Sequence, residues 1–286
     1  MWPVLSPILP RDLHLVSYMK YFVVSDIHGF YTPFVEALEK SGFNIDDKSH
    51  KLIICGDILD RGQEAVKVQN FILSLLDEDR AILIRGNHED LMIDFIKEYP
   101  FYVLMKNIFR SRHYANGTFD TALQLTGVDY ITAQTLYGSD EMLDKLSRTP
   151  FVQTIIPECV DYFETEHYIF VHGWIPCTKE VVGEKMNSRG RKYEYISSWR
   201  ESSKSDWYNA RWVNGMEVCM KYKVKEPNKT IVCGHWHCSY GHSTFENHGA
   251  EIGEDADFSP FYSDGIIALD ACTALSGIVN CIVLED

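Results

Sequence analysis

The sequence has few basic residues relative to acidic ones. It contains 27 Lys and Arg against 41 Asp and Glu, which gives a formal net charge of -14 at pH 7. This balance argues against non-specific binding to nucleic acid or to an anionic membrane surface, because both attract positive charge. It leaves room for a local basic pocket. We therefore expect neither a nucleic acid nor a membrane as a partner.

Long apolar runs and closely paired cysteines are also missing. No stretch is long and apolar enough to span a bilayer, and the N-terminus lacks the positively charged start of a secretory signal. The eight cysteines include no C-x-x-C pair. Cys55, Cys233, Cys272 and Cys281 lie in apolar runs typical of buried thiols. We expect a soluble, cytoplasmic protein with reduced cysteines.

The first eighteen residues differ from the rest of the chain. Pro3, Pro7 and Pro10 break any regular element there, and Met19 directly precedes the first apolar run, so that it is a second candidate for the start of the protein. We predict that residues 1–18 form a disordered or loosely docked extension. Length alone allows one or two domains, and we favour a single domain over residues 19–286.

Three short apolar runs, each interpreted as a buried strand, are followed directly by polar residues. The runs cover residues 21–24, 52–55 and 81–84. The polar residues that follow them are Asp26 and His28, then Asp57, Asp60 and Arg61, and finally Asn87, His88 and Glu89. Their spacing of roughly thirty residues is the length of a strand, a crossover helix and a second strand. Three parallel strands would bring these residues to one sheet edge, where ligands bind in open α/β folds.

The rest of the chain predicts the architecture around that edge. Amphipathic helices are expected over 32–41, over 63–76 and from about 88 to Pro100. Residues 101–150 indicate a helical cap insertion and residues 174–228 an irregular one. Further strands are expected at 153–156, 168–171 and 230–233, with an antiparallel hairpin of 266–270 and 278–284. The predicted fold class is α/β (α+β), a two-sheet β-sandwich of mixed strands flanked by helices.

Two of the later strands also end in candidate ligands. His172 follows 168–171, and His235 and His237 follow 230–233. A single histidine is usually structural, but five at strand ends indicate a metal site. Asp, Asn and His together suit Mn, Fe or Zn.

In chain order, the motifs are Asp26-x-His28, Gly56-Asp57-x-x-Asp60-Arg61-Gly62, Gly86-Asn87-His88-Glu89, His172-Gly173 and Gly234-His235-x-His237. This set resembles the calcineurin-like metallophosphoesterases. The Asp60-Arg61-Gly62 and Asn87-His88-Glu89 segments are similar to the branch that contains bacterial serine/threonine phosphoprotein phosphatases.

The resemblance implies a site for two divalent metal ions, with Mn or Fe expected and Zn as an alternative. Asp26, His28 and His237 would hold one ion. Asn87, His172 and His235 would hold the other, and Asp57 would bridge them.

The resemblance also implies roles in hydrolysis. Arg61, Arg211 and Asn87 would bind the phosphate, with Arg200 as the rival of Arg211. His88 would protonate the leaving oxygen and Asp60 would orient its ring. Glu89 is expected to support a neighbouring loop or helix start.

The substrate is open at this point. The first hypothesis is a phosphomonoester, as in a serine/threonine protein phosphatase. Ser25, Trp174 and the Gly234–His237 segment depart from that pattern, so a symmetrical diadenosine tetraphosphate hydrolase or another nucleotide phosphoesterase is the alternative. The tryptophans could stack on a base or pack in the core. Substrates would be a phosphorylated protein or a small phosphoester or nucleotide. A non-catalytic metal-binding scaffold is disfavoured by His88, Asp60 and Arg61.

Overall fold

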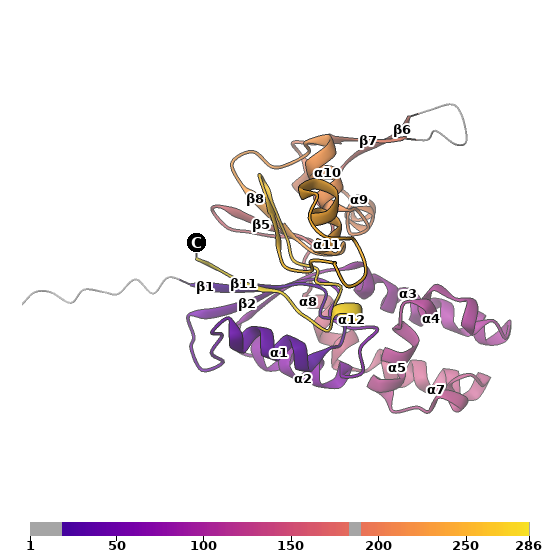
Figure 1. Ribbon diagram of the computed structural model, residues 1–286. Coiled ribbons are helices and arrows are strands. Elements are labelled where there is room, and N and C mark those ends of the chain that lie inside the picture. The colour runs from indigo at the N-terminus through magenta and orange to yellow at the C-terminus, as the bar shows by residue number, and fades with distance from the viewer. Residues whose placement is uncertain (1–18, 183–189, 286) are drawn as a thin grey trace, which may run out of the picture.

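The computed structural model describes residues 19–182 and 190–285, so the predicted extension at 1–18 lies outside the described residues. Two β-sheets face each other, and helices cover their outer faces (Figure 1). This is the mixed two-sheet sandwich that the sequence predicts. No helix in the described ranges is both long and apolar enough to cross a membrane.

The first sheet is built from the early strands of the chain. Its order is β11-β1-β2-β3. The bounds are Lys20–Val24 for β1, His50–Cys55 for β2, Ala81–Ile84 for β3 and Cys281–Glu285 for β11. Strands β1, β2 and β3 are parallel and are joined by the crossover helices α1 (Tyr31–Lys40) and α2 (Ala65–Leu76). Their carboxyl ends therefore share one edge, as predicted.

The second sheet has the order β4-β5-β8-β10-β9. The bounds are Phe163–Glu164 for β4, Tyr168–Phe170 for β5, Thr230–Cys233 for β8, Phe261–Ser263 for β9 and Ile266–Ala268 for β10. Strands β5, β8 and β10 are parallel. The residues that follow them therefore also meet at one end of the sheet.

The central strands are buried on both faces. In β1, Val23 packs between the sheets together with Ile53 and Val232, whereas Phe22 and Val24 belong to the core beneath the helices. A strand that is buried on both faces has a continuous apolar sequence instead of one that alternates between apolar and polar residues. This burial on both faces explains why the strands could be predicted from their apolar runs.

A helical cap follows the first sheet. Helix α3 spans Asn87–Leu104 and leads to η1 (Ile108–Arg110), α4 (Arg112–Ala115), α5 (Thr118–Thr126), α6 (Tyr130–Ala133) and α7 (Leu136–Ser147). The prediction that α3 ends at Pro100 is wrong, because the helix continues for another turn. Tyr99 and Val103 lie buried in the core on either side of the proline, and their packing holds that turn in place.

The segment predicted as an irregular insertion at 174–228 is more regular than expected. Strands β6 (Cys177–Val182) and β7 (Gly190–Tyr195) form an antiparallel hairpin. They are followed by η3 (Trp199–Glu201), α9 (Lys204–Ala210) and α10 (Gly215–Tyr222). After β8 come α11 (Cys238–Gly241), η4 (His242–Glu246) and, after β10, the short α12 (Thr273–Ser276).

Two strand predictions are wrong. Residues 153–156 lie in the helical elements η2 (Phe151–Ile155) and α8 (Ile156–Glu158), where the backbone N–H of Phe151 donates to Gln69 of α2. A short apolar run does not distinguish a strand from a buried helix. The expected tail hairpin does not form either, because β10 pairs with β8 and β9 whereas β11 pairs with β1. The connector through α12 carries the chain from one sheet to the other.

Candidate active site

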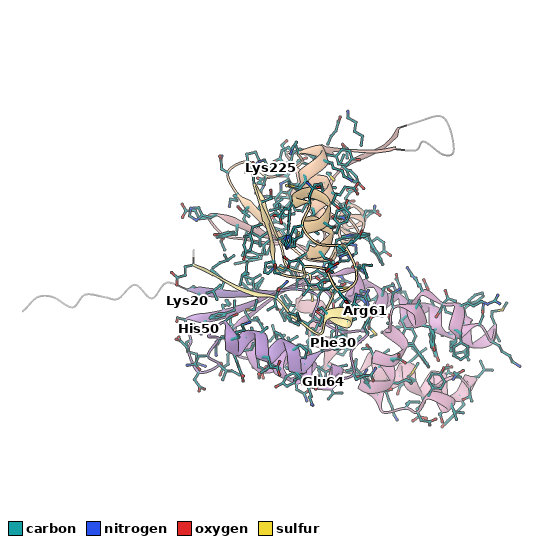
Figure 2. All side chains as sticks on the ribbon, viewed as in Figure 1. Lys20, Phe30, His50, Arg61, Glu64 and Lys225 are labelled. Atoms are coloured by element: carbon teal, nitrogen blue, oxygen red, sulfur yellow. The ribbon has the colours of Figure 1, made fainter. Side chains whose placement is uncertain are left out.

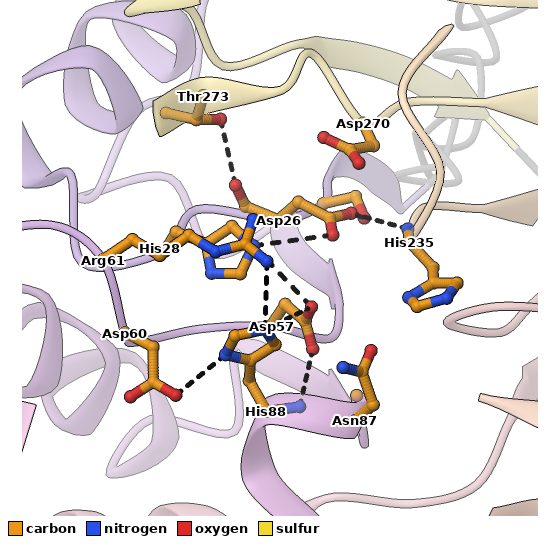
Figure 3. Close-up of polar contacts among 12 residues, drawn as sticks. Asp26, His28, Asp57, Asp60, Arg61, Asn87, His88, His235, Asp270 and Thr273 are labelled. Carbon is orange, nitrogen blue, oxygen red and sulfur yellow. Dashed lines mark hydrogen bonds and ion pairs between the residues drawn. The ribbon is translucent and has the colours of Figure 1, made fainter. Parts of the chain in front are cut away.

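The predicted ligands converge where the carboxyl ends of both sheets meet (Figure 3). They come from the loops after β1, β2, β3, β5 and β8. Asp26, His28, Asp57, Asn87 and His172 are each at most 2% exposed. So many buried polar groups in contact need mutual partners or a cation, because an unpaired buried charge is costly.

Asp57 lies at the centre of this cluster. Its Oδ2 is 3.7 Å from Nε2 of His28 and 3.8 Å from Nε2 of His88, whereas its Oδ1 is 3.3 Å from Nε2 of His172. Two groups have the geometry to hold a cation: His28, Asp57 and His88, and Asp57, His172 and His235. The two carboxylate oxygens thus face two different histidine groups, the arrangement that a bridging ligand requires.

The first group is oriented by backbone contacts. Nδ1 of His28 is 3.1 Å from the carbonyl oxygen of Leu59, which only accepts, so Nδ1 carries the proton and Nε2 keeps its lone pair. Asp26 accepts hydrogen bonds from the backbone N–H of His235 at 3.0 Å and from the hydroxyl of Ser25. Asp26 thereby connects the loop after β1 with the loop after β8.

The second group is held in the same way. Nδ1 of His172 donates to the carbonyl oxygen of Cys55 at 2.8 Å, and Nε2 is 2.8 Å from Oδ1 of Asn87. The ring of His235 lies against that of His172, with centroids 5.1 Å apart. A cation here would meet two imidazoles, an amide oxygen and Asp57, a mixed N/O set that suits Mn, Fe or Zn.

His237, which was also predicted as a ligand, belongs to neither of the two groups. Its Nδ1 is 2.8 Å from the hydroxyl of Ser239, and its Nε2 is 3.5 Å from Glu251. The sequence interpretation missed Asp270, a carboxylate that is 7% exposed and lies near Asp26 in Figure 3. Asp270 directly follows an apolar run, as Asp26 and Asp57 nearly do, so the same strand-end signal could have found it.

His88, Asp60 and Arg61 lie next to His28, whose ring centroid is 4.6 Å from that of His88. Nδ1 of His88 donates to Oδ2 of Asp60 at 2.8 Å, and the guanidinium of Arg61 is 3.3 Å from Nε2 of His88. The hydroxyl of Thr118, at the start of α5, donates to the same Oδ2 at 2.7 Å. Thr118 was not predicted, because it belongs to the cap and no strand-end pattern marks it.

The cap also touches Arg61 directly. Figure 2 labels Arg61 beside α12 and the base of the cap. A Cβ on Gly117 would lie 2.5 Å from the backbone nitrogen of Arg61, so only glycine allows this approach.

Several site residues have a left-handed backbone, which is uncommon outside glycine. They are Asp26, His28, Asp57, Asp60, Arg61 and His235. Such strain collects at functional sites and needs support from the surroundings. Glu89 supplies part of it, because its carboxylate accepts from the backbone N–H groups of Asp57, Ile58 and Gly86 at 3.1, 3.0 and 2.7 Å. This is the loop-supporting role expected for Glu89.

The three candidate phosphate-binding arginines differ in their partners. Arg211 is 7% exposed and pairs with Asp90 at 2.6 Å and with Asp161. Arg200 pairs with Glu164 at 2.7 Å and with Glu226 at 3.0 Å. Of the three, Arg61 alone has no carboxylate partner among the described residues. Its charge is therefore not neutralised by a carboxylate of the described structure.

The electrostatics of the cluster favour a cation. Burial alone would raise the pKa of Asp57, but His172 and His88 hold it well below its ordinary value, so this carboxylate is anionic. Burial and then the His172 charge lower the pKa of His235 to about 3, which keeps its imidazole neutral. Burial and then Asp270 raise the pKa of Asp26 well above its usual range.

The pKa of His172 is also shifted. Burial would lower its pKa, but Asp57 outweighs burial and raises the pKa to about 10. A cation bound at Asp57 would displace one proton of His172, because metal ligands must be deprotonated. The two groups of Asp, Asn and His donors therefore fit divalent metal ions.

Comparison with known proteins gives the family. The calcineurin-like phosphoesterase family model matches residues 19–239. The symmetrical bis(5'-nucleosyl)-tetraphosphatase of Buchnera aphidicola subsp. Acyrthosiphon pisum is 44% identical over 71 residues, which cover 25% of this chain and 24% of that protein. The asymmetrical bis(5'-nucleosyl)-tetraphosphatase PrpE of Bacillus velezensis is 28% identical over 92 residues, 30% of this chain and 37% of that protein.

The matches thus span 24% and 37% of the length of these relatives. Among solved structures, a cold-active protein tyrosine phosphatase aligns over 94% of this chain and 74% of its own, with a TM-score of 0.48 and 18% identity. Since the family model covers most of the chain, the protein belongs to the calcineurin-like phosphoesterases.

Proposed function

We propose that the chain hydrolyses phosphoric esters at a site for two divalent metal ions, with Mn or Fe expected and Zn as an alternative. The observation that carries this proposal is the position of Asp57, whose two carboxylate oxygens face separate histidine groups. Ions held there would neutralise charge on the phosphoryl oxygens and lower the pKa of a water molecule. The described ligand positions are Asp26, His28, Asp57, Asn87, His172 and His235. His237 stays a prediction, which metal content in His237→Ala would test.

The chain's own residues supply the remaining steps. Arg61 would bind the equatorial oxygens of the phosphoryl group and stabilise the charge that develops on them. Burial lowers the pKa of His88, but Asp57 and Asp60 outweigh it and raise the pKa above its ordinary value, so the imidazolium is available as an acid. Nδ1 donates to Asp60, so Nε2, which lies 3.3 Å from the Arg61 guanidinium, would pass the proton to the leaving oxygen.

Two substrate classes remain in the proposal. A phosphomonoester, such as a phosphoserine or phosphothreonine side chain, is supported by the pairing of His88 with Asp60, because an alkoxide leaving group needs an acid. A dinucleoside polyphosphate is supported by the relatives, two of which are named for this activity. The free cysteines of the chain fit a reducing compartment such as the cytoplasm.

The test is a substrate panel with Mn, Fe, Zn and Mg supplied separately. We expect turnover of p-nitrophenyl phosphate with Mn or Fe, and none in Asp57→Asn. Comparing a phosphoserine peptide with diadenosine tetraphosphate then separates the two classes. No turnover of any of these phosphoesters with any of the four metals, in protein that binds metal, would leave only the scaffold hypothesis.

A further inference from the structure

A cavity of about 840 Å³ lies beside the metal-binding edge, in the second half of the chain. Its walls come from the hairpin β6–β7, from α9 and α10, and from the loop after β8. Small-molecule sites typically have volumes of roughly 300 to 1,000 Å³. The cavity is therefore large enough for a nucleoside, and none of the roles assigned above uses it.

Two tryptophans connect this cavity to the site. The ring centroids of Trp212 and Trp236 lie 5.9 and 6.1 Å from that of His235, and both residues line the cavity. They are 41% and 37% exposed, whereas Trp174, Trp199 and Trp207 are buried in the core. Of the five tryptophans that the structure describes, these two are therefore the candidates for stacking on a ligand.

The charges of the lining exclude a phosphate-binding role for the cavity itself. Asp206 and Glu217 contribute carboxylates, and the lining includes no lysine or arginine among the described residues. Tyr240 adds another aromatic wall. The side-chain amide of Asn209 makes no hydrogen bond within the described part of the chain, so it can donate and accept for a ligand. Such a lining suits a neutral aromatic ring with polar edges, since aromatic stacking tolerates any base.

The position of the cavity relative to His88 shows which part of a substrate would enter it. His88 lies near Oδ2 of Asp57, whereas His172, which packs against His235, lies near Oδ1. Figure 3 shows His88 and His235 on different sides of the cluster. The leaving group must be close to His88, because that residue would protonate it. A ring in the cavity then belongs to the group that stays on phosphorus.

We propose that this cavity is a subsite for a nucleobase carried by the substituent that remains bonded to the reacting phosphorus. The inference rests on the proposed phosphoesterase function. It names the substrate as a nucleotide with a second group on phosphorus, as in a phosphodiester or a phosphoanhydride. Hydrolysis breaks the bond from phosphorus to the leaving oxygen, forms one to the oxygen of water and delivers a proton to the leaving oxygen. The product that keeps the base is a nucleotide with a free phosphate.

Binding tests the cavity without any turnover. Isothermal titration of the full chain with adenosine, and with ribose as the control that lacks the base, should show binding of adenosine only. Trp236→Ala should bind adenosine about tenfold more weakly, since loss of base stacking has effects of this order. Trp236→Phe should keep most of the affinity, and Tyr137→Ala, which removes an exposed aromatic ring from the cap, should keep all of it. Absence of adenosine binding would overturn the proposal.

Kinetics test the assignment to the retained group. Thymidine 5'-(p-nitrophenyl phosphate) and methyl p-nitrophenyl phosphate release the same phenol and differ only in what stays on phosphorus. We expect a KM at least tenfold lower for the thymidine ester, and a ratio of the two KM values that falls toward one in Trp236→Ala and Trp212→Ala. Equal KM values in the unmodified chain would contradict the proposal.

Different results would overturn the proposed hydrolysis and the proposed base-binding cavity. A chain that hydrolyses p-nitrophenyl phosphate but neither diester would keep the proposed function and overturn the subsite for a retained group. A chain that binds adenosine with the expected tryptophan dependence but hydrolyses no phosphoester with any metal would overturn the function and the substrate assignment, while the base-binding cavity would stand.

Discussion

Thr118 donates a hydrogen bond of 2.7 Å to Oδ2 of Asp60, the same oxygen that accepts from His88. The predicted acid is therefore held by a residue of the helical cap as well as by the loop after β2. The other oxygen of Asp60 is buried without a hydrogen-bond partner in the described structure. The cap thus directly contacts the pair of His88 and Asp60, to which the predicted acid role belongs.

The first prediction follows from that contact. Thr118→Val keeps the shape and removes the hydroxyl, so Asp60 should hold His88 less firmly. We expect kcat on an alkyl phosphate to fall about three- to tenfold, the size of one hydrogen bond, while kcat on p-nitrophenyl phosphate changes less. Thr118→Ser should restore the rate. Thr126→Val is the matched control, because it removes a hydroxyl of the same helix that bonds only to the backbone of Ala122 and Val128.

The second prediction concerns His88 itself. General acid catalysis typically contributes on the order of 10² to 10⁴ in rate. His88→Asn should lose roughly that factor on an alkyl phosphate, whose alkoxide is strongly basic, and much less on an activated aryl phosphate. Asp60→Asn should show the same difference between the two substrates, with smaller rate losses. Equal losses on both substrates at unchanged metal content would assign His88 a positioning role instead.

The third prediction concerns Asp57. Asp57 is the residue that the two groups of the described structure share, so Asp57→Asn should lose tight binding of the metal pair along with activity. Elemental analysis after gel filtration measures the first, and turnover with Mn measures the second. Glu251→Gln, a change at a carboxylate that faces only His237, serves as the comparison. An active Asp57→Asn protein with two ions bound would refute the bridging role.

The fourth prediction separates the arginines. Arg61→Ala should keep its metal content and weaken inhibition by inorganic phosphate about tenfold, because a charge-assisted contact is lost. Arg211→Ala should instead lower the free energy of unfolding by about 2 kcal/mol, because Asp161 loses its cation and buried Asp90 keeps only its contact with Arg85. Urea titration and phosphate inhibition, measured on both variants, distinguish the roles. Weaker phosphate inhibition in Arg211→Ala with unchanged stability would instead support the sequence-based expectation that Arg211 binds the phosphate.

The sequence was sufficient to predict which residues meet at the edge of the first sheet, because the pattern that indicates them is local. Each early strand is buried on both faces and ends in a polar residue, so Asp26, Asp57 and Asn87 could be predicted to meet from the strand–helix–strand spacing alone. The pairing of the last strands is not local. Residues 266–270 and 278–284 have hairpin patterns, but they do not pair with each other: β10 lies between β9 and the distant β8, and β11 pairs with the distant β1.

The remaining site features depend on tertiary contacts that no local pattern encodes. Thr118 reaches Asp60 only because the cap folds back onto the loop after β2. Arg200 and Arg211 have similar aromatic neighbours in the sequence, and nothing local shows that both are neutralised by carboxylates from other segments. His237 stands two residues after His235, yet its ring contacts Ser239 and Glu251.

The last prediction uses the ion-pair network of Arg200, which lies outside the metal cluster. Hydrogen bonds from Arg200 lower the pKa of Glu164. Burial opposes this effect and Lys229 adds to it, and the resulting pKa is about 2. A carboxylate whose pKa is depressed by folding stabilises the fold above its unfolded pKa, and this contribution is lost as the pH falls through the folded pKa. The window therefore runs from about pH 4.5 down to about pH 2.

Glu164→Gln should accordingly reduce the free energy of unfolding at pH 7 by about 1 kcal/mol, a figure near the top of the range for solvated pairs because Arg200 is bidentate on Glu164. Urea titrations of both proteins should converge as the pH is lowered toward 2, and the difference at pH 7 should shrink in high salt because the network is partly exposed to screening. Glu201→Gln, a neighbouring charge change outside the network, is the control. A difference that stays constant from pH 7 to pH 2 would mean that Glu164 acts through packing and not through its charge.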